Sequence, residues 1–153
     1  MPPVSRLTFD QAMYHFVSGY TAKVAGTEVG ITDPVSTFSA CFGEAFLPKH
    51  PYLYAQMLAE KTKKYDANVW LINTGWTGGK YGVGQRMSLK DTRQILENIH
   101  NGTLENEEFE TIGGFNLSIP KHCNGLKDQD ILNPVNTWDD KDLFKMTSVR
   151  LAK

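Results

Sequence analysis

The chain has 153 residues, of which 41% are hydrophobic and 22% are charged, and its formal net charge is −1. This length and composition indicate an ordered, globular domain or part of one. A nearly neutral chain has no general attraction for nucleic acid or for an anionic membrane, and no apolar run reaches the roughly 18 residues that span a bilayer. We therefore expect no nucleic-acid partner and no membrane segment. The N-terminus lacks the basic-then-apolar pattern of a secretory signal, and Cys41 and Cys123 form no disulfide framework, so a reducing cytoplasm is expected.

The first half of the chain contains the signals of two helices. Thr8 and Gln11 form a capping box before an apolar helical stripe, and Gly19 is a plausible end for that helix. Residues 26–36 are rich in Gly, Thr, Asp and Pro, which indicates a loop. A second helix is predicted to begin at Pro51, whose missing N–H would be unpaired at that position anyway, and to end near residues 65–68.

The second half alternates strands and helices. The run "NVWLINT" (68–74) predicts a short buried strand, and a glycine-rich segment follows it directly. A third helix is predicted from Ser88 to Gly102. Ser88 and Asp91 would cap its backbone N–H groups, and its apolar face would comprise Leu89, Thr92, Ile95, Leu96 and Ile99. The run "FNLSIP" (115–120) predicts a further strand, and the C-terminal tail predicts an amphipathic helix.

The segment "NTGWTGGKYGVGQR" (73–86) holds five glycines but matches neither common phosphate-binding pattern. A P-loop requires two glycines five residues apart followed by Lys and Ser or Thr, whereas here Lys80 is followed by Tyr81. The third glycine of the dinucleotide pattern is replaced by Met87. Two interpretations remain open. Arg86, just before a helix, can stack on a base or meet an anion, or it can lie in solvent on a surface hairpin.

Other candidate sites have weaker support. A catalytic thiol at Cys41 is conceivable, but no activating base is identifiable, and a small buried apolar role is favoured. The four histidines have no companion ligands at metal-binding spacing, and the acidic clusters at 105–110 and 139–142 are typical of solvated surface. We therefore expect no metal-ligating and no catalytic residue in this chain.

Several blocks together resemble the ATP-dependent phosphoenolpyruvate carboxykinases. They are "AMYHFVSGYTAKVAGTE" (12–28), "TFSACFG" (37–43), "LINTGWTGGKYGVGQRMSLKDTR" (71–93), "FNLSIP" (115–120) and "LNPVNTW" (132–138). The resemblance covers essentially the whole chain, in order, but only the C-terminal third of such an enzyme. It implies an α/β fold with a mixed sheet flanked by three or four helices. Residues 1–153 would form a single domain portion, truncated at both ends.

The resemblance also implies a function. The family converts oxaloacetate and ATP to phosphoenolpyruvate, carbon dioxide and ADP in gluconeogenesis, with magnesium and manganese. The phosphate loop, the metal ligands and the oxaloacetate-binding arginines would lie outside this chain, in the remainder of the parent polypeptide, so the chain alone would be inactive. The family pattern Arg-apolar-Ser-apolar-Lys-Asp-Thr matches 86–92, which implies adenine-nucleotide contacts from Arg86, Met87 and Thr92. Met87 replaces the commoner Ile, a volume-tolerant change.

Two other interpretations are kept. The chain could be a stand-alone, non-catalytic nucleotide-binding module, which the size of the natural product would reveal. It could also belong to the GTP-using branch of the same reaction, although the run "RMSLKDT" (86–92) is more similar to the ATP branch.

Overall fold

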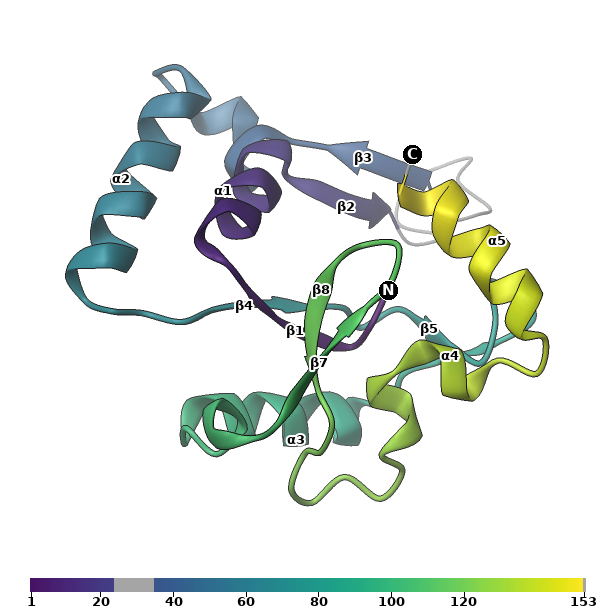
Figure 1. The fold of residues 1–153 in the computed structure, drawn as a ribbon. Helices are drawn as coiled ribbons and strands as arrows, with labels where there is room; N and C mark the ends of the chain where they lie inside the picture. Colours follow the sequence, from purple (N-terminus) through teal and green to yellow (C-terminus); the bar gives the residue numbers. More distant parts are fainter. Residues whose placement is uncertain (24–34, 153) are drawn as a thin grey trace. The chain divides into compact units, whose positions relative to one another are not determined.

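The computed structural model describes residues 1–23 and 35–152, and these form two compact units (Figure 1). One unit is Leu7–Val69, which we call the α1–α2 unit. The other comprises Met1–Arg6 and Trp70–Lys153, which we call the sheet unit. Most of the loop predicted at 26–36 lies outside the described residues, and its last two residues begin a strand.

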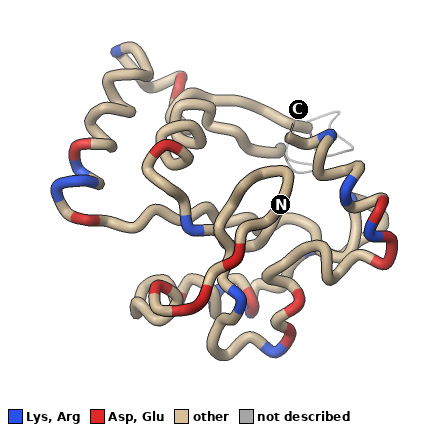
Figure 2. The backbone as a smooth tube through the Cα atoms, in the orientation of Figure 1, with Lys and Arg blue, Asp and Glu red and all other residues tan. Residues whose placement is uncertain are grey.

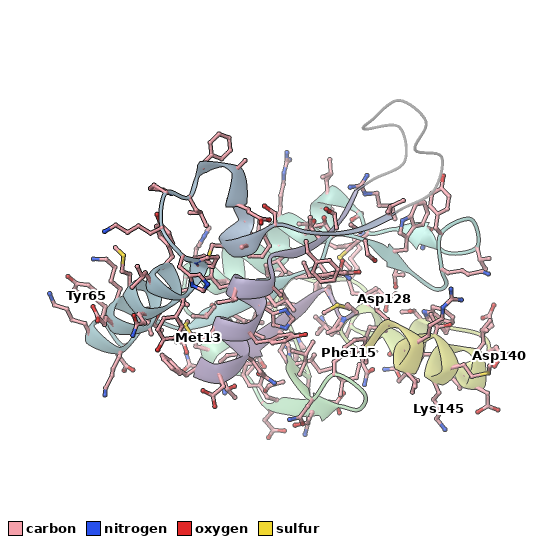
Figure 3. All side chains as sticks on the ribbon, turned by 90° about the horizontal axis from the view of Figure 1, so that it is seen from above. Met13, Tyr65, Phe115, Asp128, Asp140 and Lys145 are labelled. Carbon is pink, nitrogen blue, oxygen red and sulfur yellow. The ribbon has the colours of Figure 1, made fainter. Side chains whose placement is uncertain are left out.

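The α1–α2 unit carries two helices and an antiparallel hairpin. Its elements are α1 (Phe9–Ser18), β2 (Tyr20–Lys23), β3 (Val35–Phe38), the 3-10 turns η1 (Ala40–Phe42) and η2 (Glu44–Phe46), and α2 (Pro51–Lys64). Met13 of α1 lies on the side of that helix that faces α2 (Figure 3), where it lines an apolar groove together with Ala55 and Ala59. Both predicted helices of the first half are therefore confirmed.

The ends of α1 follow the predicted chemistry. The Thr8 side chain accepts from the Gln11 N–H, and the Gln11 side chain accepts from the Thr8 N–H, which completes the capping box. Gly19 ends the helix in the left-handed region with φ of 53°. A Cβ at this position would lie 1.6 Å from the Ser39 carbonyl oxygen, so only glycine can occupy it.

The sheet unit is built on one four-stranded sheet with the order β4-β1-β8-β7. Strand β8 is antiparallel to both β1 and β7. The strands of this unit are β1 (Val4–Leu7), β4 (Val69–Ile72), β5 (Trp76–Thr77), β6 (Gln85–Arg86), β7 (Phe109–Ile112) and β8 (Leu117–Pro120). Its helices are α3 (Leu89–His100), η3 (Leu104–Asn106), η4 (Asp130–Leu132), α4 (Pro134–Thr137) and α5 (Lys141–Ala152). The expected α/β class, with a sheet flanked by helices, is confirmed.

The core of the sheet unit joins the sheet to α3. Val4 of β1 and Ile95 of α3 are 0% and 1% exposed and belong to one apolar cluster, so α3 packs on the sheet. The other buried members are Leu104, Cys123, Leu126, Ile131 and Leu132, with Trp70, Ile72 and Ile99 packed against them. This packing fixes the axis of α3, and with it the position of the junction that precedes α3.

Two expectations about burial need correction. Strand β4 is half-buried along its length, not fully buried. On α3, Leu89 was predicted on the apolar face, but it lies in the first turn and is 74% exposed. Asn98, which was not part of that predicted face, is buried, and its side chain donates to the carbonyls of Gln94 and Asn124. Helix α5 forms as predicted, and its apolar residues Leu143, Met146 and Val149 are exposed in this chain.

Charged residues of both signs are interspersed along the described chain (Figure 2). Helix α5, for example, carries one acidic residue, Asp142, among three basic ones, Lys141, Lys145 and Arg150, and the labelled Lys145 projects from the helix (Figure 3). Within residues 1–23 and 35–152, no helix has the length and hydropathy that crossing a bilayer requires.

Candidate nucleotide-binding site

The glycine-rich segment folds as a tight antiparallel hairpin between β5 and β6. Trp76 pairs with Arg86, and Thr77 pairs with Gln85. The connecting loop closes on the Lys80 carbonyl, which accepts from the N–H groups of Val83 (3.0 Å) and Gly84 (2.9 Å). The segment is therefore a close-packed hairpin that leads directly into α3.

Glycine is required where the two sides of this hairpin touch. A Cβ on Gly84 would lie 2.4 Å from the Thr77 carbonyl oxygen and 2.7 Å from the backbone N and O of Gly79. A Cβ on Gly79 would lie 2.8 Å from the Gly84 nitrogen. These contacts are backbone to backbone, so no side-chain movement could relieve them. The glycines allow close approach of one strand to the other.

The backbone N–H groups of the segment point inward. The Gly75 N–H donates to the Asn73 side chain, the Gly78 N–H donates to the Thr137 hydroxyl, and the Val83 and Gly84 groups donate to Lys80. A phosphate cradle requires such N–H groups to be free and convergent. The four N–H groups named here are occupied within the protein, which agrees with the failure of both phosphate-binding sequence patterns.

Arg86 and Trp76 lie on the same face of the hairpin, because directly opposed residues of an antiparallel pair share a face. The Trp76 ring meets the Tyr81 ring edge-on at a centroid distance of 5.1 Å, and Trp76 keeps 36% of its surface exposed. Arg86 is exposed, and among the described residues it has no carboxylate partner. A planar cation and a partly exposed indole ring therefore occupy directly opposed positions on one face of the hairpin.

The junction from β6 to α3 is fixed by short-range hydrogen bonds. The Ser88 hydroxyl oxygen accepts from the Asp91 N–H at 3.0 Å and so caps α3. The Asp91 carboxylate binds the Ser88 hydroxyl at 2.6 Å, where a contact with a backbone N–H was expected. The Thr92 hydroxyl donates to the Ser88 carbonyl at 3.0 Å. Arg86, half-buried Met87 and Thr92 are thus brought together within a single strand-to-helix junction.

The other candidate groups do not assemble a second site. Cys41 is half-buried, not fully buried as expected. Desolvation by its surroundings raises the pKa of the Cys41 thiol, which keeps the thiol neutral and argues against a nucleophile. Both cysteines are free. No group of three or more His, Cys, Asp or Glu side chains among the described residues could hold a metal ion.

Sequence reasoning missed one residue that contacts the hairpin. The Thr137 hydroxyl, at the end of α4, lies 3.1 Å from the Thr77 hydroxyl and 3.1 Å from the Gly78 nitrogen. Because Thr137 is about sixty positions away along the chain, no local pattern could have indicated this contact.

Comparisons with known proteins identify the family. The profile of the family described as phosphoenolpyruvate carboxykinase matches residues 1–129. The chain belongs to the ATP-dependent phosphoenolpyruvate carboxykinase family. It is 58% identical over 153 residues to a protein of Campylobacter lari and 56% identical over 153 residues to one of Leptospira biflexa, each named phosphoenolpyruvate carboxykinase (ATP). A protein of Christiangramia forsetii with the same name is 53% identical over 152 residues.

These matches cover 99–100% of this carboxykinase chain but only 28–29% of each relative. The chain therefore spans less than a third of the length of the curated carboxykinases it matches. The family resemblance expected from the sequence is confirmed.

Proposed function

We propose that the full-length protein converts oxaloacetate and ATP to phosphoenolpyruvate, carbon dioxide and ADP, and that this chain supplies contacts to the adenine nucleotide. The observation that carries the proposal is the family match, which includes the β5–β6 hairpin and the start of α3. By the resemblance, the reaction belongs to gluconeogenesis in the cytoplasm.

Within this chain, Arg86, Met87 and Thr92 are the proposed nucleotide contacts. Arg86 presents a flat guanidinium on the same face as Trp76, a geometry suited to stacking on a purine. Met87 offers an apolar surface to the base, and Thr92 offers a hydroxyl oxygen that can still accept a hydrogen bond while it donates to Ser88. Together they would bind and orient the base and sugar rather than the phosphates.

The reacting groups are assigned to the rest of the full-length protein. The family reaction uses magnesium and manganese, yet the described residues offer no group of side chains that could hold either ion, so no metal step is assigned here. We propose that the triphosphate loop, the metal ligands and the oxaloacetate-binding residues all belong to the sequence of the full-length protein that is not in this chain.

The experiment that tests the nucleotide role is Arg86→Lys in the full-length protein. Lysine keeps the charge but loses planar stacking, and the loss of about 1–2 kcal/mol should raise the KM for ATP roughly 5- to 30-fold. The KM for oxaloacetate should stay unchanged. Arg150→Lys on the exposed surface of α5 is the matched control and should alter neither constant. An unchanged KM for ATP in the Arg86→Lys protein would show that the role is wrong.

The mass of the natural protein distinguishes the proposed enzyme from the alternative, a stand-alone, non-catalytic nucleotide-binding module. The mass of the natural product should match that of the relatives, of which this chain covers 29%. A natural product of this chain's own length would favour the module. Steady-state assays with ATP and GTP on the full-length protein would decide the nucleotide.

A further inference from the structure

The Thr137 hydroxyl is the centre of a three-way hydrogen-bond junction in the sheet unit. It donates its only proton to the Pro134 carbonyl at 3.0 Å, within α4. It therefore accepts from the Thr77 hydroxyl and from the Gly78 N–H, both at 3.1 Å. A hydroxyl has one donor and two acceptor positions, so this group is fully used.

These bonds reach the hairpin next to the proposed nucleotide contacts. Thr77 ends β5 and is adjacent to Trp76, the residue that pairs with Arg86. The Gly78 backbone lies directly against the end of α4, since a Cβ there would be 3.4 Å from the Thr137 carbonyl oxygen. Figure 1 shows β5 and α4 side by side.

The hairpin needs such support because its ladder is very short. Only two residue pairs join β5 to β6. An isolated two-stranded hairpin is marginally stable in water even when it is longer than this. Asn73 supports the start of the segment by accepting from the Gly75 N–H, and Thr137 supports the other end of β5. Without the Thr137 hydroxyl, a partly buried N–H and a partly buried hydroxyl would lose their partner.

We propose that Thr137 is a positioning residue for nucleotide binding: by tethering β5 to α4, it holds Arg86 in the orientation that meets the base, without touching the nucleotide itself. This inference rests on the proposed role of Arg86. It assigns a function to a residue outside the span of 1–129 that the family profile matches.

The test compares Thr137→Val with Thr137→Ser in the full-length protein. Valine keeps the shape but removes the hydroxyl, so the KM for ATP should rise about five- to ten-fold, the worth of one or two hydrogen bonds. The kcat and the KM for oxaloacetate should change less than about two-fold. Serine restores the hydroxyl and should restore the KM for ATP. A rise in the KM for ATP that serine does not rescue would overturn the proposal.

Hydrogen exchange supplies a readout that does not depend on activity. In the Thr137→Val protein without nucleotide, peptides that cover residues 76–86 should exchange faster, while peptides from α3 should exchange at the wild-type rate. The Thr137→Ser protein should match wild type throughout. Equal exchange of residues 76–86 in wild type and Thr137→Val would overturn the tether.

If the Thr137→Val protein does not fold, Thr77→Val tests the same hydrogen bond from its other partner. It removes one of the two bonds and leaves the Gly78 N–H paired, so the KM for ATP should rise about two- to three-fold. In a double-mutant cycle, Thr77→Val with Thr137→Val should be no worse than Thr137→Val alone. An unchanged KM in the Thr77→Val protein, or strict additivity in the cycle, would contradict the proposal.

Arg86→Ala, measured in parallel, distinguishes a failure of the positioning role of Thr137 from a failure of the proposed nucleotide-binding role of Arg86. If Arg86→Ala weakens ATP binding and Thr137→Val does not, the positioning role fails while the proposed function stands. If Arg86→Ala has no effect on ATP, the nucleotide role of the hairpin fails, and the inference about Thr137 fails with it.

Discussion

At the scale of single residues, Cys123 shows how burial lowers the reactivity of a thiol by raising its pKa. Its side chain is 0% exposed in the core of the sheet unit, and Gln129 binds both its backbone N–H and its carbonyl. Burial, with a smaller contribution from the negative charge of Glu107, raises the pKa of the Cys123 thiol to about 11. A thiol with this pKa is inert at neutral pH, which fits a packing role.

The raised pKa makes stability depend on pH. Because the folded pKa lies above the usual value of 9.0, the contribution of the neutral thiol is fully present below about pH 9 and is lost as pH rises toward about 11. Thermal unfolding of the full-length protein between pH 8 and 11 should therefore show a steeper fall in Tm for wild type than for Cys123→Ala. Parallel Tm curves for the two proteins would contradict the assignment.

At the scale of elements, the hairpin shows why five glycines occur without a phosphate site. Gly79 and Gly84 bring two backbones into contact, and the N–H groups of Val83 and Gly84 donate to the Lys80 carbonyl. The result is a short ribbon that carries Arg86 to the N-terminus of α3. The glycines therefore shape the hairpin that carries Arg86, the residue proposed to contact the nucleotide.

Gly84→Ala in the full-length protein tests this packing. The added Cβ would lie 2.4 Å from the Thr77 carbonyl oxygen, and such overpacking should cost about 1–3 kcal/mol of hairpin stability and raise the KM for ATP. Gly113→Ala is the matched control, because nothing lies within 4 Å of its Cβ position and its φ is not in the left-handed region. Denaturant unfolding and the KM for ATP are the measurements. Equal behaviour of the two variants would refute the steric account.

At the scale of the whole molecule, the proposed role of this chain is limited to contacts with the base and sugar of the nucleotide, and no group of three or more His, Cys, Asp or Glu among the described residues could hold a metal ion. Hydrogen bonds between charged groups are roughly twice as strong as neutral ones, and the triphosphate of ATP with its metal ion offers many of them. The N–H groups of Gly75, Gly78, Val83 and Gly84 are occupied within the protein. The chain alone should therefore contribute only part of the affinity for the nucleotide.

The isolated 153-residue chain should accordingly bind ATP weakly. We expect a Kd well above the micromolar range in calorimetry, against tighter binding by the full-length protein, and no turnover of oxaloacetate. Addition of magnesium should leave the affinity of the isolated chain unchanged, since the chain has no ligand set for the ion among its described residues. Binding at micromolar concentration or tighter would show that the chain holds the phosphates after all.

The sequence alone indicated the family and the helices α1, α2, α3 and α5 with strands β4 and β8, whereas β1, β7 and α4 were not predicted. The Thr8–Gln11 box, Pro51, Gly19 and Ser88 fixed where helices begin and end, because capping depends on neighbours within a few positions. The block around Arg86 indicated the family, since its order of residue types is specific. Burial was predicted less well. Leu89, predicted on the apolar face of α3, proved exposed, and the burial of the polar Asn98 was not predicted, because tertiary neighbours decide which face of a helix is covered.

Only the tertiary structure decided how the candidate site is held. Thr137 meets Thr77 and Gly78 across about sixty positions, and Asn98 meets the Asn124 carbonyl across 26. The inward direction of the hairpin N–H groups likewise depends on the folded path of the backbone. Local patterns follow from propensity and capping within a few residues, whereas contacts between distant segments arise only when the chain closes on itself and pairs its buried polar groups.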